Sequence, residues 1–216
     1  MPRKSNKTDA YLTHPVITDR IMKLLPDNLP KGTIVEPSAG TGSFVNSLEK
    51  KYPAKAKSGK IIAVEIYPEF AEVMKSSTGA KVLTRNFLTW QPKKSPLLVI
   101  GNPPFSMCEE FVTHALEITK ESNGEVIFLL RAAFMESKGR MEFNRTAPLK
   151  RVNILVNRPS FFREEEDGTW SFKGSDQTMY AVFQWDWSYS GPRQIDFIED
   201  DWKKLVKEYD KYRKEG

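Results

Sequence analysis

The sequence predicts an α/β fold with a doubly wound, mostly parallel sheet. Two observations carry this prediction. Short apolar runs alternate along the chain with segments of helical period. The first of these runs, Thr33–Glu36, passes into a loop of small residues and then into a helical pattern, which is how nucleotide-binding sheets begin. At 216 residues, the chain is long enough for one domain with a full core.

The elements follow from the same patterns. A polar stretch at residues 1–10 is expected to be flexible, and a helix is expected from Pro15 to Leu25 because proline suits a first turn. Strands are expected near residues 33–36, 61–65, 81–84, 97–100, 126–130, 152–156 and 179–185, with helical patterns between the first five.

Three later segments complete the predicted fold. The helix from Glu109 to Lys120 would pack through one apolar face. The polar, glycine-containing stretch 163–175 predicts a mobile hairpin. Residues 199–212 predict an amphipathic helix, because their apolar positions have helical spacing.

The loop after the first strand indicates a nucleoside-like, cationic ligand. It contains Gly40 and Gly42, but the third glycine of a dinucleotide fingerprint is replaced by Val45. Glu36, just before the loop, would repel a phosphate and attract an ammonium or sulfonium group. Glu65 follows the next strand at the position where such folds place an acid on ribose hydroxyls.

A stiff turn, Gly101–Phe105, follows the apolar run 96–100. Its two prolines fix the backbone and remove two N–H donors, so the Asn102 side-chain oxygen and nearby carbonyls form a cluster of acceptors beside an aromatic ring. Such a cluster suits an NH2 group on a flat ring. A plain connection between strand and helix is the alternative reading of this turn.

Together, the glycine loop and the Asn-Pro-Pro-Phe turn resemble those of class I S-adenosylmethionine-dependent amino-methyltransferases. Their order along the chain resembles the gamma-type DNA adenine N6 methyltransferases. The resemblance implies a Rossmann-like, seven-stranded sheet whose last strand is antiparallel, with S-adenosylmethionine as cofactor. The family usually has an aspartate where this chain has Asn86.

The resemblance also implies a role for each matching residue. Those implied for catalysis are Asn102, Pro103 and Phe105. Those implied for binding the cofactor are Thr13, Pro15, Glu36, Ser38, Ala39, Gly40, Gly42, Glu65, Ile66, Asn86, Phe87 and Asn102. Those implied for holding the target base are Pro104, Phe105, Arg158, Phe161 and Phe162.

The expected reaction is methyl transfer to the N6 amine of a flipped adenine in DNA. Three alternatives stay open at this point. The same turn could serve RNA bases or a glutamine amide of a translation factor. A scaffold that binds cofactor weakly is conceivable given Asn86, and a dinucleotide oxidoreductase is disfavoured by Val45.

Composition bounds the partners and the compartment. The net charge of +5 is compatible with nucleic acid, and the basic residues flanking the target-base loop are the better candidates for phosphate contacts: Arg145, Lys150, Arg151, Arg158 and Arg163. The single Cys108 allows no disulfide within the chain, and two histidines predict no metal site. We expect a cytoplasmic protein, in the host cytoplasm if phage-encoded, because no run resembles a signal peptide or membrane span.

The expected organisation is a methyltransferase domain at residues 1–187 and a C-terminal extension at 188–216 with an amphipathic helix. No separate target-recognition domain is expected. Sequence specificity would then be loose or delivered by a partner protein, and a homodimer is a further expected partnership.

Overall fold

The computed structural model describes residues 11–164, 170–172 and 178–215. Within these residues the main sheet has eight strands, in the order β11-β7-β10-β6-β5-β2-β3-β4. Its strands are β2 (Ile34–Glu36), β3 (Ile61–Glu65), β4 (Lys81–Thr84), β5 (Leu98–Gly101), β6 (Glu125–Arg131), β7 (Leu149–Leu155), β10 (Tyr180–Asp186) and β11 (Gln194–Ile198). Strands β2 to β6 of this sheet run parallel to one another, whereas β10 runs antiparallel to both β6 and β7.

The α/β Rossmann-like fold and the antiparallel strand are therefore confirmed, and the strand count of seven is corrected to eight. The additional strand, β11, pairs in parallel with β7 at the edge of the sheet. Its side chains are mostly exposed, so it lacks the buried apolar run by which the other strands were recognised. β11 lies beyond residue 187, where the sequence-based boundary of the main domain was placed.

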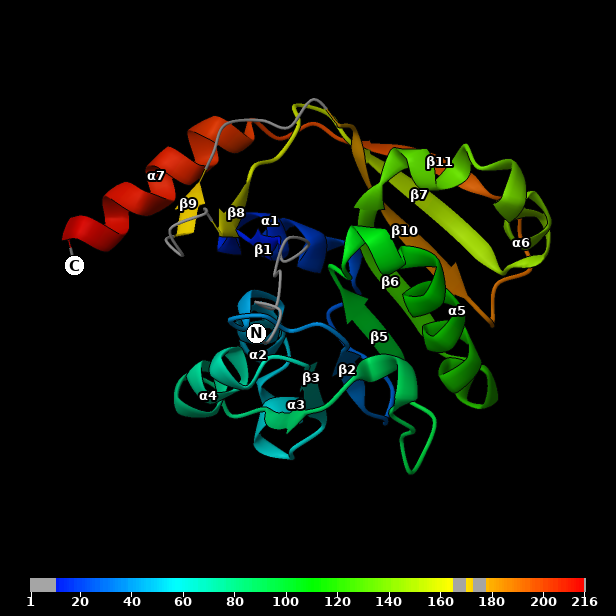
Figure 1. Cartoon of the computed structure of the whole chain (residues 1–216), viewed down its shortest axis with the longest axis horizontal. Helices are drawn as coiled ribbons and strands as arrows, with labels where there is room; N and C mark the ends of the chain where they lie inside the picture. The colour runs from blue at the N-terminus through cyan, green and yellow to red at the C-terminus, as the bar shows by residue number, and fades with distance from the viewer. Residues whose placement is uncertain (1–10, 165–169, 173–177, 216) are drawn as a thin grey trace, which may run out of the picture.

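Helices cover both faces of the sheet (Figure 1). They are α1 (Pro15–Ile21), α2 (Ser43–Lys51), α3 (Pro53–Lys57), α4 (Pro68–Ser77), α5 (Cys108–Thr119), α6 (Met141–Thr146) and α7 (Trp202–Glu215). One core cluster packs α1, α2, α4 and the start of α7 against the sheet. The other core cluster packs α5 against the sheet. The predicted packing face of α5 is buried as expected, through Phe111, Ala115, Leu116 and Ile118.

A second, three-stranded sheet brings together segments that are far apart in the sequence. Its order is β1-β8-β9, from β1 (Leu12–Thr13), β8 (Phe161–Glu164) and β9 (Trp170–Phe172). Thr13 is paired with Phe161 in an antiparallel ladder. β8 and β9 form the predicted hairpin; residues 165–169 and 173–177 of the predicted mobile stretch lie outside the described residues, as does the N-terminal tail 1–10.

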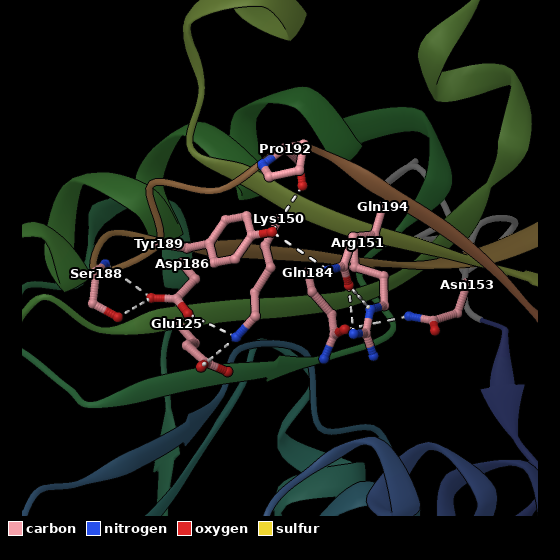
Figure 2. A network of polar contacts seen from close by, with 10 residues as sticks. All are labelled: Glu125, Lys150, Arg151, Asn153, Gln184, Asp186, Ser188, Tyr189, Pro192 and Gln194. Atoms are coloured by element: carbon pink, nitrogen blue, oxygen red, sulfur yellow. Dashed lines mark hydrogen bonds and ion pairs between the residues drawn. The ribbon is translucent and has the colours of Figure 1, made fainter.

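A polar network ties β6, β7 and β10 together away from the aromatic core (Figure 2). Lys150 lies between two carboxylates, 2.9 Å from Asp186 Oδ2 and 3.5 Å from Glu125 Oε1. Ser188 donates to Asp186 Oδ1 from both its backbone nitrogen and its hydroxyl. On the same strand as Lys150, Arg151 donates to Gln194 of β11. These contacts link neighbouring strands at this end of the sheet. They also mean that Lys150 and Arg151, two of the cations expected to contact phosphate, already interact with protein groups.

Among the described residues, no helix is long and apolar enough to cross a bilayer.

Candidate active site

A cavity of about 360 Å³ opens where the carboxyl ends of β2, β3 and β5 meet. In open α/β sheets, ligands bind outside the carboxyl ends of the strands, where the strand order reverses. Here β2 is flanked by β3 on one side and β5 on the other, so the cavity lies at that reversal. Eight of the predicted site residues line it: Ser38, Gly40, Glu65, Ile66, Asn86, Phe87, Asn102 and Pro104.

The glycine loop forms the floor of this cavity in a conformation that needs its glycines. Gly40 has φ of +52°, and a Cβ there would lie 2.7 Å from Leu12 Cδ2. Gly42 has φ of +93°, and a Cβ there would press on Met74 of α4. Gly40 therefore faces the cavity, whereas Gly42 allows α2 and α4 to pack closely. Ala39, beside Gly40, lines a smaller adjoining pocket together with Thr13.

Glu65 joins the end of β3 to the glycine loop. Its Oε2 accepts a hydrogen bond from Gly40 N at 2.6 Å and its Oε1 accepts one from Tyr67 N at 2.9 Å. Burial raises the pKa of the Glu65 carboxyl, while these backbone donors act in the opposite direction. The carboxylate thus fixes the loop and lines the cavity at the same time.

Glu36 lies beneath the loop and is 1% exposed. Its Oε1 accepts a long hydrogen bond of 3.4 Å from Ser38 N, and its Oε2 is buried with no hydrogen-bond partner among the described residues. A Cβ at Gly101 would collide with this carboxylate. Burial raises the pKa of Glu36 well above its ordinary value, and nearby Glu65 adds to the shift. A buried, unpaired acid of this kind suits a cationic ligand group.

Asn102 directly follows β5, and its amide is fixed in one orientation. Its Nδ2 donates to the Tyr11 carbonyl and to Thr13 Oγ1, each at 3.0 Å. A main-chain carbonyl can only accept, so the NH2 group must be the one that faces Tyr11. Asn102 Oδ1 is left buried with no hydrogen-bond partner among the described residues. The turn therefore offers a preorganised acceptor at the cavity.

Phe105 is 9% exposed and lies in an aromatic cluster. Its ring centroid lies 4.9 Å from that of Tyr11 and 5.4 Å from that of Tyr180. Phe161 completes the cluster with an edge contact at 6.2 Å. Pro103 is buried, and Pro104 accepts a hydrogen bond from Met107 N at 3.1 Å, which starts the next helical turn.

The remaining predicted target-base residues lie apart from the cavity wall. Phe161 is 1% exposed within the aromatic cluster. Phe162 stacks on His14 with a centroid separation of 5.7 Å, and Arg158 is exposed on the loop before β8. The pairing of β1 with β8 nevertheless connects these residues to Asn102 through Thr13.

A family model describes the same part of the chain. Residues 3–141, which carry the glycine loop, Glu65 and the Asn-Pro-Pro-Phe turn, match the model of the ribosomal RNA adenine dimethylase family. The chain belongs to this family. It is a class I S-adenosylmethionine-dependent methyltransferase, so its cofactor is S-adenosylmethionine.

Two curated relatives are named as type II methyltransferases. The chain is 34% identical over 104 residues to the type II methyltransferase M.CvrRI of Paramecium bursaria Chlorella virus XZ-6E, a match that covers 47% of this chain and 26% of the relative. It is 24% identical over 123 residues to the type II methyltransferase M.TthHB8I of Thermus thermophilus, covering 57% of this chain and 27% of the relative. The matched region spans about a quarter of each relative.

The solved structures support the fold. A proposed class I S-adenosylmethionine-dependent methyltransferase from Listeria monocytogenes superposes with a TM-score of 0.65 at 13% identity, over 92% of this chain and 68% of the other. At this identity, the likeness concerns the fold alone.

The residues of this methyltransferase fit the cofactor. Glu36 Oε2, beneath the loop, has no partner among the described residues and would suit a positively charged group, and the absence of a side chain at Gly40 leaves room for Leu12, which also lines the cavity. Ile66 and Phe87 supply apolar surface suited to adenine. Asn86 Oδ1 accepts a hydrogen bond from Leu88 N at 3.0 Å, which leaves a second lone pair for a ligand.

Sequence reasoning missed several residues that line the cavity: Tyr11, Leu12, Tyr67, Phe70, Arg85, Ser106, Met107 and Phe111. Tyr11 and Leu12 directly precede Thr13, which the resemblance implied for the cofactor, so this proximity was a usable signal. Tyr67 directly follows the predicted residue Ile66, and Ser106 directly follows the predicted residue Phe105. Arg85 directly precedes the predicted residue Asn86, whereas Phe70 carried no local signal, because only the folding of α4 brings it to the cavity.

Proposed function

We propose that this methyltransferase transfers a methyl group to the exocyclic N6 amine of adenine in DNA. The observation that carries the proposal is Asn102, whose NH2 group is held by Tyr11 and Thr13 while its Oδ1 has no partner among the described residues. An acceptor fixed in this way suits an amine that must present its hydrogens to the protein.

The chemistry explains why an acceptor is more useful than a base at this position. The lone pair of an adenine amine is shared with the ring, so the amine attacks poorly in its planar form. Asn102 Oδ1 would hold one amine hydrogen and favour the pyramidal form, in which the lone pair is available. As the nitrogen becomes positive, a preorganised acceptor stabilises it more than it stabilises the ground state.

The cofactor supplies a methyl group already activated by positive sulfur. The protein then contributes mainly by aligning the two reactants, an effect that reaches ~7–11 kcal/mol in favourable cases. Glu36 and Glu65 lie on the glycine-loop side, and Asn102 lies at the neighbouring strand end. Pro103 and Pro104 keep the turn rigid because their φ angles are restricted.

DNA is favoured as the polymer by the two type II methyltransferase relatives. Adenine in ribosomal RNA is the second candidate, because the description of the family model names it. Both share the amine and the chemistry at Asn102. A glutamine amide of a translation factor has support only from the turn itself.

The proposal can be tested by transfer of labelled methyl groups. The protein is incubated with labelled S-adenosylmethionine and, in separate reactions, with DNA, ribosomal RNA and a protein extract, and each polymer is digested to its monomers. Label in N6-methyladenine from DNA is expected. Label that appears only in RNA nucleosides or in methylglutamine would refute the DNA assignment.

A further inference from the structure

A second cavity of about 270 Å³ lies on the far side of the Asn-Pro-Pro-Phe turn. Ser106 lines both this cavity and the one described above, so the two meet at the turn. Phe105 forms one wall, and Arg131 and Arg140 supply its cations. Arg131 ends β6, next to β5, which ends at Gly101 just before Asn102, and both strand ends reach the same edge of the sheet.

Arg131 has no polar partner in the described part of the protein. Its guanidinium carbon lies 4.9 Å from the centroid of the Phe105 ring. Its Nε is buried and makes no hydrogen bond with any described residue. A buried N–H group without an acceptor is rare and unfavourable, so it points to a ligand or a bound water.

Arg140, which lines the same cavity, differs from Arg131 because its guanidinium has hydrogen-bond partners in the protein. Its Nε donates to the Phe134 carbonyl at 3.0 Å, and its Nη atoms reach Glu109 and the Ala133 carbonyl at 3.4 Å. Arg140 therefore serves the local fold, and it also neutralises Glu109. The other acid at this cavity, Glu110, is exposed to solvent. The charge available to a ligand is that of Arg131.

The cations expected from sequence to contact phosphate are placed differently. Lys150 is held by Asp186 and Glu125, and Arg151 donates to Gln194 (Figure 2). Arg158 is exposed on a loop, and the side chain of Arg163 lies outside the described residues. Arg131 is the cation whose own position is adjacent to the turn.

We propose that Arg131 binds a phosphodiester group that flanks the target nucleotide. This inference rests on the proposed function, which makes a nucleic acid the substrate. A guanidinium offers Nε and Nη hydrogens as a planar fork that matches two phosphate oxygens. Stacking on Phe105 fixes the plane of this fork before substrate arrives. Phosphate contacts of this kind set the position of the strand rather than its sequence.

Two exposed methionines lie near Arg131: Met135 follows it by four residues, and Met179 precedes Tyr180, which is the partner of Arg131 on β10. Met135 and Met179 are 40% and 53% exposed, and Ala132 N donates to the Met179 carbonyl at 2.9 Å beside Arg131. The exposed thioether side chains offer apolar, polarizable surface on which a nucleobase can pack. Arg131 itself stacks on Phe105, so its positive charge lies beside an aromatic ring as well.

The test compares single neutralised phosphates with substitution of the arginine. Short fluorescent DNA strands with one adenine carry either natural phosphates or one uncharged methylphosphonate, placed in turn on each side of that adenine. Binding is followed by anisotropy and methylation by label transfer, for the wild-type protein, Arg131→Gln and Arg131→Lys. Arg151→Gln is the matched control, because that arginine already has a protein partner.

One methylphosphonate position is expected to raise the wild-type Kd about tenfold, the effect of losing one charged hydrogen bond. Arg131→Gln should show the same loss on natural DNA and no further loss at that position. Arg131→Lys should recover only part of the affinity, because lysine keeps the charge and lacks the fork. The Kd for S-adenosylmethionine should stay within about twofold for every variant, as should DNA binding by Arg151→Gln.

The inference would be overturned if, at every methylphosphonate position, the fold-increase in Kd from the modification were the same for Arg131→Gln as for the wild type. An unchanged Kd of Arg131→Gln for natural DNA would also overturn it. The binding readout does not depend on turnover. Wild-type protein that binds DNA through Arg131 but transfers no methyl group to it would refute the proposed function and leave the phosphate contact standing.

Discussion

Asn102 Nδ2 donates a 3.0 Å hydrogen bond to the main-chain carbonyl of Tyr11, which lies 91 positions earlier in the sequence. This contact determines which end of the amide is available to a substrate. It also makes the segment before α1 part of the acceptor site, although Tyr11 itself is not a residue that the chemistry of amino-methyl transfer would single out.

Asn102→Ala should lower kcat about 100- to 1,000-fold, the usual effect of removing a preorganised polar group from a transition state. The Kd for S-adenosylmethionine should change little, because Glu36 and the glycine loop are untouched. Steady-state kinetics and calorimetric titration measure the two quantities. Asn46→Ala, at an exposed position of α2, is the control. Equal losses in binding and turnover would remove Asn102 from the catalytic role.

Thr13→Val should lower kcat about tenfold, because Asn102 would lose one acceptor that fixes its amide. The substitution keeps the shape of this buried side chain, and Thr13→Ser keeps the hydroxyl and should restore the rate. Both variants are compared by kcat and by thermal unfolding. A serine variant as slow as the valine variant would show that the hydroxyl does not act through Asn102.

Asn86→Ala should weaken binding of S-adenosylmethionine about tenfold with little change in kcat at saturation, because one hydrogen-bond acceptor at the cavity is lost. Asn86 also caps the turn at Phe87–Thr89 by accepting from Leu88 N. Asn86→Asp keeps this cap and separates the two roles. If the alanine and aspartate variants bind the cofactor as tightly as the wild type, Asn86 has no part in the cofactor site.

Glu36 should make the cofactor-free protein less stable at higher pH. Its pKa is raised in the folded state, so its contribution to stability is present in full below the unfolded pKa of about 4.3 and is lost as pH rises through the folded pKa. Glu36→Gln should therefore be more stable than the wild type at pH 8, by about 1–3 kcal/mol, and similar at pH 4. Urea unfolding without cofactor measures this, with exposed Glu72→Gln as control. A stability difference that does not change with pH would contradict the assignment.

Asp186 should have the opposite effect on stability to Glu36, because its contribution is lost as pH falls. Hydrogen bonds from Ser188 and Lys150 outweigh its burial and lower the pKa of its carboxyl. Its contribution to stability is thus present above the unfolded pKa of about 3.9 and is lost as pH falls through the folded pKa. Asp186→Asn should cost about 1–3 kcal/mol at pH 7 and progressively less below pH 4. Urea unfolding across this range checks the trend, and a constant cost down to pH 2 would count against it.

Much of the fold was predictable because the central parallel strands β2, β3, β5 and β6 are largely buried. Runs such as Ile61–Glu65 are apolar throughout and end in glycine, proline or acidic residues, so their positions are visible in the sequence. Asn102 and Glu65 were found for the same reason, since each directly follows such a run. The strand order then brings them to one edge.

The rest depends on contacts between distant segments. β1 has two residues and is recognisable only by its partner β8. β11 has no continuous apolar run. It pairs with β7 at the edge of the sheet, where most of its side chains are exposed. The sequence also placed Phe105 against the substrate, and nothing local to the turn indicates that Arg131 and Tyr180 pack on its ring.

The ladder between Thr13 and Phe161 has a consequence for synthesis of the protein. A ribosome makes the glycine loop and the Asn-Pro-Pro-Phe turn early, yet the strand that braces Thr13, and through it Asn102, emerges some 60 residues after the turn. The nascent chain can thus acquire its cofactor pocket well before its acceptor is aligned.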